Sequence, residues 1–447
     1  MPDHKKPSHD TSSTAETTAD QTPSPEPRPP AGTSRRTAVV GALGIGTGVA
    51  ATLGTQAAVH AAHTSSAASE ADVVPPLLEQ RVPFYGPRQA GIETPAPTYG
   101  LFIAIDLNDS VDKSALKRLL RILTEDAAAL TQGKAPVSDQ EVELTNVAAS
   151  LTVTLGFGER IFEIAAPKKK PYWLKPLPAF SKIDKLDKKW NDGDLLIQLC
   201  CDDRFTLSHA QRMLLKAIRS FGRVRWTQEG FRRAYGSERP GQTMRNLFGQ
   251  VDGTINPRTE EGTMDDFVWG QHKDLTPWQE GGTSVVIRRI HMNLDTWDQV
   301  DRPAREDAIG RKLSNGAPLT GEKETDVVDL SAKNDLGFDV IAPYSHVRRS
   351  SPQSPVESIL RRGYNYDLPV TDGSGFSEHG ETSGGVSNTG LIFAAYQADP
   401  VKQFVPIQKR LADLDMLNTW TTPIGSAVFA IPAGCEPGGF IGEDLFD

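Results

Sequence analysis

Apolar and polar positions along the chain repeat the same order of elements twice. In the first half, residues 99–107 (YGLFIAIDL) form an apolar, β-rich run that predicts a strand, and residues 111–130 follow with apolar positions at helical spacing. In the second half, residues 283–294 (TSVVIRRIHMNL) again predict a strand, and residues 298–311 predict a charged helix with Pro303 near its start. The pattern of a strand followed by a helix therefore occurs in both halves.

Each half continues with further strands and another helix. The first half predicts strands at residues 151–157 and 194–201 and a helix at residues 208–219, and the second predicts a strand at residues 390–397 and a helix from about residue 400 to 411. Two halves with this alternation indicate an α+β fold built as a duplicated sandwich of strands and helices, rather than one doubly wound sheet.

A charged stretch interrupts the first half. Residues 165–192 carry loop signals and include the consecutive lysines Lys168, Lys169 and Lys170. A solvated insertion is the usual structure for such a stretch, and a binding patch is the rarer alternative.

The composition changes sharply near the start of the chain. Residues 1–70 are rich in Ser, Thr, Pro and Ala and contain no Phe, Tyr or Trp, so they cannot bury a core. We therefore expect a disordered leader over residues 1–70, an N-terminal half over residues 73–245 and a C-terminal half over residues 246–447.

The leader contains the features of an export signal. Arg35 and Arg36 precede an uncharged stretch of Ala, Gly and Val at residues 38–62, and the small residues at 57–71 could hold a cleavage site. This order resembles a twin-arginine (Tat) signal, which would make the Tat machinery a partner and place the protein outside the cytoplasm: secreted, periplasmic or on the outer face of the cell membrane. A single membrane anchor is the alternative, because the run is long enough to span a bilayer.

Charge and cysteine content exclude some classes of function. The chain has 48 Lys and Arg against 57 Asp and Glu, a formal charge of −9, which argues against nucleic acid as a partner. Cys200 and Cys201 are adjacent and Cys435 stands alone, so neither a CxxC pair nor a zinc knuckle is present.

The histidines favour a site that needs only one of them. Five of the nine lie beyond residue 70, and no two of these five form an i, i+4 pair or an H-E-x-x-H motif. Haem iron is such a site, because the porphyrin supplies four nitrogens and the protein needs to give one axial ligand.

Two local motifs contain candidate functional residues. Residues 246–257 (NLFGQVDGTINP) contain an Asp-Gly turn. The structural alternative to a functional role for this aspartate is that it caps a tight turn. Residues 344–352 (YSHVRRSSP) are followed by residues 359–364 (ILRRGY), for which a basic surface loop is the alternative.

In this order, the motifs resemble one known family. Gly249-x-x-Asp252-Gly253-Thr254, followed along the chain by His346 and Arg361, resembles the dye-decolourising haem peroxidases, and most of all their exported, Tat-dependent branch. Flanking blocks that add to the resemblance are residues 82–92 (VPFYGPRQAGI), 309–319 (IGRKLSNGAPL) and 431–435 (IPAGC), so it covers nearly the whole chain after the leader.

The resemblance implies a fold and an activity. The fold is a pair of ferredoxin-like α+β halves, with one haem b per chain held mainly by the second half. The activity is reduction of hydrogen peroxide and one-electron oxidation of bulky aromatic or dye-like donors. The sequence leaves open whether the chain forms a homo-oligomer.

The resemblance also assigns roles to particular residues. His346 is the expected proximal ligand of the haem iron, and Asp399 is expected to accept a hydrogen bond from its other ring nitrogen, with a helix N-cap as the alternative role for Asp399. Asp252 is expected to carry a peroxide proton as general base and then acid, which predicts an acidic optimum. Arg361 is expected to stabilise the developing negative charge, and Arg362 is the competing candidate.

Several other residues are candidates for contact with haem or for electron relay. Those expected to touch the porphyrin are Gly253, Thr254, Ile255, Ser351 and Pro352. On charge alone, Arg288 and Arg348 are candidate propionate partners. Leu391 and Phe393 are candidate pocket walls, with an ordinary core position as the alternative. The candidate electron relays to large donors are Tyr396, Trp226 and Trp297, with packing as the alternative role.

Two other functions remain open at this stage. The first is an exported haem-handling protein that releases or carries iron, as deferrochelatases do, and the second is a secreted binding domain without a cofactor. The absorption spectrum before and after one equivalent of peroxide would separate all three hypotheses.

Overall fold

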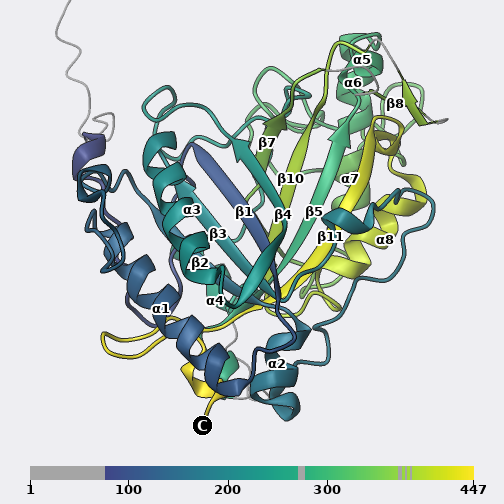
Figure 1. The fold of residues 1–447 in the computed structure, drawn as a ribbon. Coiled ribbons are helices and arrows are strands. Elements are labelled where there is room, and N and C mark those ends of the chain that lie inside the picture. The colour runs from purple at the N-terminus through teal and green to yellow at the C-terminus, as the bar shows by residue number, and fades with distance from the viewer. Residues whose placement is uncertain (1–75, 270–276, 371–374, 378–379, 383–384) are drawn as a thin grey trace, which may run out of the picture. The chain divides into compact units, whose positions relative to one another are not determined.

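The computed structural model describes residues 76–269, 277–370, 375–377, 380–382 and 385–447, all of which belong to the unit Ala68–Asp447 (Figure 1). The expected leader at residues 1–70, with its Tat-type signal and the alternative membrane anchor, lies outside the described residues. Within the described residues, no helix is both long and apolar enough to cross a membrane.

The first half is a four-stranded antiparallel sheet with helices on one face. Its elements in chain order are β1 (Tyr99–Leu107), α1 (Lys113–Thr131), β2 (Thr152–Phe157), α2 (Glu159–Ala165), β3 (Leu195–Cys201), α3 (Arg204–Ile218) and β4 (Gly222–Phe231). The strands lie side by side in the order β2-β3-β1-β4. This is the βαββαβ arrangement of a ferredoxin-like unit.

The second half repeats this arrangement. Its strands are β5 (Thr283–Met292), β7 (Tyr364–Asp367), β10 (Thr389–Gln397) and β11 (Thr421–Ile431), in the spatial order β11-β5-β10-β7. The helices between β5 and β7 are α5 (Leu294–Trp297), α6 (Arg302–Ile309) and α7 (His346–Ser350), and α8 (Phe404–Leu414) connects β10 to β11. The shorter elements are α4 (Thr263–Phe267), β6 (Leu360–Arg361), β8 (Gly375–Ser377) and β9 (Gly380–Thr382).

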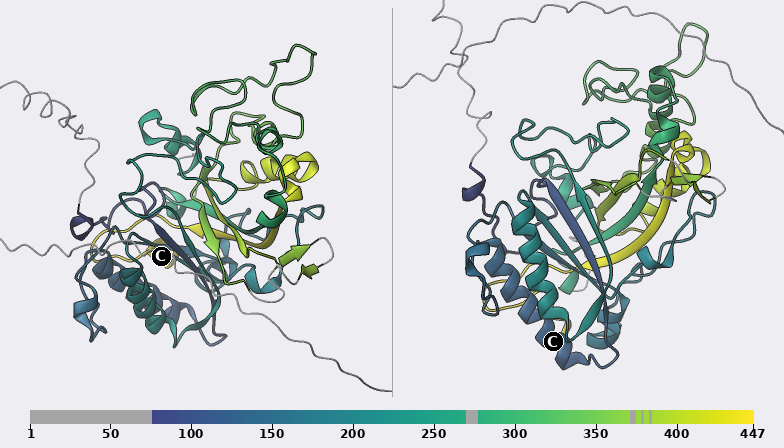
Figure 2. Two further views of the ribbon diagram at one scale, coloured as in Figure 1. Left: turned by 90° about the horizontal axis from the view of Figure 1, so that it is seen from above. Right: turned by 45° about the horizontal axis from the view of Figure 1, so that its top comes forward.

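The two halves join edge to edge. β11 pairs with β2 at Ala430 and Phe157, and β4 pairs with β7 at Phe231 and Asn365. Figures 1 and 2 show α1 and α3 beside the strands of the first half and α7 and α8 beside those of the second. The expected fold, a duplicated pair of ferredoxin-like α+β halves, is confirmed.

The strands that the sequence predicts best are those buried on both faces. All but two residues of β1 are buried, so its continuous apolar run is the pattern of a strand covered on both sides. Next to it, α1 turns Leu116, Leu119, Leu120 and Leu123 to the core at helical spacing, and Asp112 caps its first turn by accepting a hydrogen bond from the backbone N–H of Ala115.

The charged stretch at residues 165–192 is not simply a solvated insertion. Trp173, Leu174 and Phe180 are each at most 5% exposed and therefore belong to the interior. Asp184 forms an ion pair with Arg288 of β5, which is buried. The stretch thus joins the first half of the chain to the sheet of the second.

Candidate functional site

A cavity of about 470 Å³ lies in the second half of the chain, a size typical of ligand and cofactor pockets. Its walls are mostly apolar, with side chains that include Phe248, Ile290, Met292, Leu391, Phe393, Phe404, Ile407, Leu411 and Leu417. The sequence-predicted residues that line it are Asp252, Gly253, Thr254, Ile255, His346, Ser351, Pro352 and Arg361. Folding therefore brings together residues that lie far apart in the sequence.

His346 is the first residue of α7, and a hydrogen bond fixes its ring. Its Nδ1 donates to Asp415 Oδ2 at 2.6 Å, while Asp415 Oδ1 accepts from the backbone N–H of Leu417 at 3.0 Å. Burial lowers the pKa of His346, but the charge and hydrogen bond of Asp415 outweigh it, so the pKa lies above its ordinary value. Since Nδ1 is engaged, Nε2 is the nitrogen left to bind a metal from the cavity.

Asp399 does not contact His346, so its expected role as the histidine's partner is wrong. Its carboxylate accepts hydrogen bonds from the hydroxyl of Tyr172 and from the backbone N–H groups of Val401 and Lys402. Those two backbone bonds cap the turn before α8. The helix itself begins at Phe404 with Gln403 as its N-cap, so Asp399 is not the helix N-cap considered as its alternative role. Asp415 replaces it because the chain returns past His346 at the end of α8.

Asp252 and Arg361 form an ion pair at the cavity. Arg361 Nη1 donates to Asp252 Oδ1 at 3.0 Å, and both side chains are largely buried. Arg362, the competing candidate, points away: it is 4% exposed and donates to the backbone carbonyls of Ile92 and Pro95. Successive residues of an extended strand face opposite sides, which separates the two arginines.

Asn256 holds this pair in place, a role that the sequence analysis missed. Its side-chain amide donates to the backbone carbonyl of Arg361 at 2.7 Å, and its Oδ1 accepts from the N–H of Arg361 at 3.1 Å. Asn256 follows Asp252 in the same motif, so the loop that carries the carboxylate also fixes the backbone of the arginine. Gly253, between them, has a φ of 127°, which favours glycine.

The candidate propionate partners and electron relays do not all line the cavity. Arg288 lines it but pairs with Asp184, whereas Arg348 donates to the carbonyls of Leu330 and Ile341. Arg311 also lines the cavity, and burial lowers its pKa. The three aromatic candidates for electron relay are all buried: Tyr396, Trp226 and Trp297.

These features fit a haem group. One imidazole has a nitrogen free to bind iron, the walls are apolar enough to hold a porphyrin, and arginines are available on the lining. Asp252 and Arg361 are close enough to His346 for their charges to act on its pKa. An acid–base group and a fixed positive charge therefore share one cavity with a single metal ligand.

Comparisons with known proteins agree with this chemistry. The family model for the N-terminal part of Dyp-type peroxidases matches residues 89–232, and that for the C-terminal part matches residues 243–436. The chain is 36% identical over 395 residues to a dye-decolorizing peroxidase of Thermobifida fusca, covering 86% of this chain and 89% of the relative. It is 33% identical over 417 residues to a deferrochelatase of Escherichia coli, covering 89% and 94%.

Solved structures give the same result. A DyP-type peroxidase from Cellulomonas bogoriensis superposes with a TM-score of 0.78 at 45% sequence identity, covering 83% of this chain and all of the other. The ferric form of DtpA from Streptomyces lividans superposes with a TM-score of 0.76 at 35% identity, covering 83% and 99%.

Proposed function

This chain belongs to the Dyp-type peroxidase family, and from that premise we propose which of its residues carry out the reaction. The protein is a haem-dependent peroxidase that uses hydrogen peroxide and oxidises organic donors. The deferrochelatase relatives belong to the same family, and the more similar relatives are peroxidases, so iron release is not the favoured function.

We assign the binding of haem to the cavity residues. His346 would bind the iron through Nε2, and Asp415 would fix the ring and make the imidazole more electron-rich. Gly253, Thr254 and Ile255 line the cavity from one loop, Ser351 and Pro352 line it just after α7, and these five residues would hold the porphyrin. When bound, haem supplies the iron at which the O–O bond of peroxide is cleaved.

Asp252 moves the proton that this cleavage requires. Its carboxylate takes a proton from one peroxide oxygen and returns it to the other, which leaves as water. Arg361 donates a hydrogen bond to the Asp252 carboxylate and stabilises the negative charge that develops on the leaving oxygen. Two protons and two electrons, the latter from two successive donors, reduce one peroxide to two waters.

One observation carries this assignment: the Asp252–Arg361 pair and His346 line the same cavity. Stopped-flow spectroscopy of the haem-loaded protein with peroxide tests it. We expect Asp252→Asn to slow the first spectral change about a hundredfold or more, the range of general acid–base catalysis. Asp335→Asn, at an exposed loop position, is the control and should react like the wild type. A wild-type rate in the Asp252→Asn protein would overturn the assignment.

We also propose export by the Tat route, with the mature enzyme outside the cytoplasm. Support comes from the Arg35-Arg36 pair ahead of the uncharged stretch at residues 38–62. Arg35→Lys combined with Arg36→Lys should retain the protein in the cytoplasm of its host, as measured by cell fractionation. Normal export of that double variant would contradict the proposal.

A further inference from the structure

We propose that Gln250 is a further substrate-binding residue of the site: its side-chain amide donates a hydrogen bond that holds hydrogen peroxide beside Asp252. The proposal rests on the peroxidase function above. Gln250 lines the same cavity as Asp252 and stands two residues before it in the chain. It belongs to the motif at residues 246–257, but the sequence analysis gave it no role.

The side-chain nitrogen of Gln250 is buried and has nothing to bond to. Gln250 is 7% exposed, and its Nε2 has no hydrogen-bond partner among the described residues. Arg288, the other cavity-lining residue with such an atom in the described part of the chain, already has an ion pair with Asp184. A buried donor without a partner destabilises a fold, so one that lies on the wall of a cavity indicates a ligand.

A short hairpin presents Gln250 and Asp252 to the cavity together. The backbone N–H of Asn246 donates to the carbonyl of Gln250 at 3.0 Å, and that of Asp252 donates to the carbonyl of Met244 at 2.8 Å. These two bonds enclose the antiparallel bridge between Arg245 and the residue before Asp252. Alternate residues of an extended segment face the same side, so the amide of Gln250 and the carboxylate of Asp252 lie on one side of the hairpin.

Hydrogen bonds from the backbone fix which way the amide of Gln250 points. Asn246 Oδ1 accepts from the backbone N–H groups of Phe248 and Gln250 at 3.1 and 3.2 Å, so its Nδ2 is the donor of that side chain. This Nδ2 donates to Oε1 of Gln250 at 3.4 Å. The oxygen of Gln250 is therefore engaged, and its NH2 group is the end left to meet a ligand.

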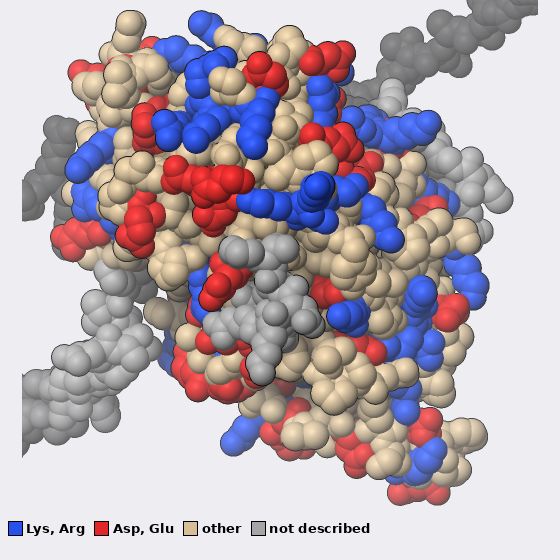
Figure 3. Space-filling model, turned by 90° about the horizontal axis from the view of Figure 1, so that it is seen from below, with Lys and Arg blue, Asp and Glu red and all other residues tan. Residues whose placement is uncertain are grey.

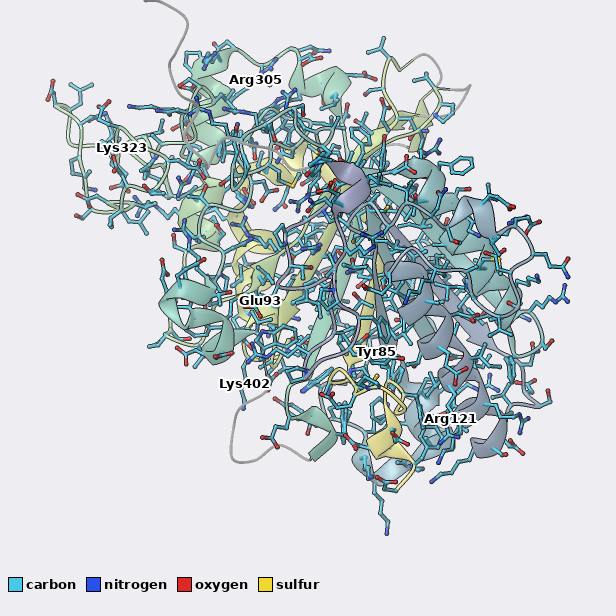
Figure 4. The ribbon with its side chains drawn as sticks, turned by 90° about the vertical axis from the view of Figure 1, so that its left-hand side faces the viewer. Tyr85, Glu93, Arg121, Arg305, Lys323 and Lys402 are labelled. Atoms are coloured by element: carbon cyan, nitrogen blue, oxygen red, sulfur yellow. The ribbon has the colours of Figure 1, made fainter. Side chains whose placement is uncertain are left out.

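Two other polar side chains of the cavity wall already have partners. The hydroxyl of Thr254 donates to Glu324 Oε1 at 2.9 Å, and Nη1 of Arg311 donates to the carbonyl of Glu324 at the same distance. Glu324 follows Lys323, which Figure 4 labels on a loop at the edge of the molecule. Both side chains therefore hold this loop, whereas the NH2 group of Gln250 is bonded to none of the described residues.

The combination of Gln250 and Asp252 suits hydrogen peroxide. Each peroxide oxygen carries one proton and two lone pairs, so it can donate to Asp252 while it accepts from Gln250. A haem propionate can also accept from an amide, but it would bring a second negative charge next to Asp252, and Gln250 carries no charge to offset it. The amide keeps its own protons, so the proton that moves is still the one carried by Asp252.

Surface charge contributes little to the binding of this substrate. Hydrogen peroxide is uncharged, and the face of the molecule seen from below carries basic side chains interspersed with acidic ones (Figure 3). Electrostatic steering acts on charged ligands and needs a field of one sign. Hydrogen bonds inside the cavity must therefore hold the peroxide, and Gln250 supplies one of them.

Gln250→Met tests the proposal in the haem-loaded enzyme, because methionine has nearly the volume of glutamine but no donor. We expect the second-order rate constant with hydrogen peroxide to fall about three- to tenfold, the effect of one hydrogen bond. The matched control is Gln228→Met on β4, which replaces another buried glutamine whose Nε2 donates to the carbonyl of Glu229. The control should react like the wild type.

A second variant separates hydrogen bonding from packing. Gln250→Glu keeps the oxygen that faces Asn246 and removes only the NH2 group, so at neutral pH it should slow the peroxide reaction at least as much as Gln250→Met. A slow reaction in Gln250→Met together with a wild-type rate in Gln250→Glu would show that the residue acts by packing alone, which would overturn the proposal.

Fluoride binding gives a readout that does not depend on turnover. Fluoride is a small ligand of ferric haem that accepts hydrogen bonds, and an absorption titration of the haem-loaded protein gives its Kd. Gln250→Met should raise this Kd about three- to tenfold at a fixed pH, and Gln228→Met should leave it unchanged. An unchanged Kd or an unchanged peroxide rate in Gln250→Met would overturn the proposal.

The same variants separate the two possible acceptors. If Gln250→Met only speeds the loss of haem to apomyoglobin, the amide bonds to a haem propionate and the proposal is wrong. None of these results would touch the roles of Asp252 and Arg361, which the peroxide reaction of Asp252→Asn tests separately.

Discussion

Replacing Asp415 by Asn tests whether this residue, and not Asp399, controls the metal ligand. Asn still offers an oxygen to Nδ1 of His346 but removes the negative charge next to it. The Asp415 side chain is 4% exposed, so solvent and salt screen this charge poorly. A charge-assisted hydrogen bond of this kind contributes about 1.5–3 kcal/mol, and about 1.4 kcal/mol is a factor of ten. We therefore expect haem affinity or the peroxide rate to fall roughly tenfold to a hundredfold.

Two assays measure this effect. Transfer of haem to an excess of apomyoglobin gives the rate of haem loss, and spectroelectrochemistry gives the reduction potential of the iron, which should rise because the ligand donates less electron density. Asp399→Asn is the matched control, since it also removes one carboxylate charge but does not contact His346. A wild-type potential and haem affinity in Asp415→Asn, or the same shifts in Asp399→Asn, would refute the reasoning.

Three further predictions concern stability and the geometry of the site. Asp126 is 8% exposed, and its burial together with the charge of Glu125 raises its pKa to about 6. The stability that its neutral form contributes is therefore fully present below pH 3.8, its ordinary pKa, and is lost as the pH rises through 6. Asp126→Asn should therefore stabilise the fold at pH 7.5 by up to about 3 kcal/mol in urea unfolding and by little at pH 4, and an equal gain at both pH values would contradict this. Asp184→Ala should cost about 3–5 kcal/mol in the same assay because it leaves the guanidinium of Arg288 buried and unpaired, and a loss below about 1 kcal/mol would be inconsistent with that. Asn256→Ala should slow the peroxide reaction about tenfold or more without loss of haem, because the backbone of Arg361 is no longer held; haem loss would instead indicate a structural role.

The sequence predicted the strands with a strong apolar pattern better than the strands without one. The expected strand at residues 99–107 has the bounds of β1, because helices and neighbouring strands cover it and its apolar run is unbroken. β4 (Gly222–Phe231) was missed because Arg223, Val224 and Arg225 are exposed and two of its buried positions are Gln228 and Gly230, which give no apolar signal. β7 and β11 were missed as well: β7 is short, and β11 is mostly buried but has Pro423, Gly425 and Ser426 within its apolar run.

Local motifs likewise predicted some residues of the site and missed others. Asp252, His346 and Arg361 stand in local motifs, and the structure places all three on one cavity. Asp415 carries no such signal: its neighbours indicate only the end of a helix and the cap of the turn Met416–Thr419. Its contact with His346, 69 residues away in the chain, depends on how α8 packs against α7, which no local pattern reveals.

The central claim is that Asp252 and Arg361 act as a pair on peroxide in the cavity of His346. A double-mutant cycle on the second-order rate constant with hydrogen peroxide tests it most directly, using Asp252→Asn, Arg361→Leu and the double variant. If the two residues act as a unit, each single substitution slows the reaction strongly and the double variant is little slower than the worse single variant. Losses that multiply in the double variant, or a single variant that reacts at the wild-type rate, would contradict the claim.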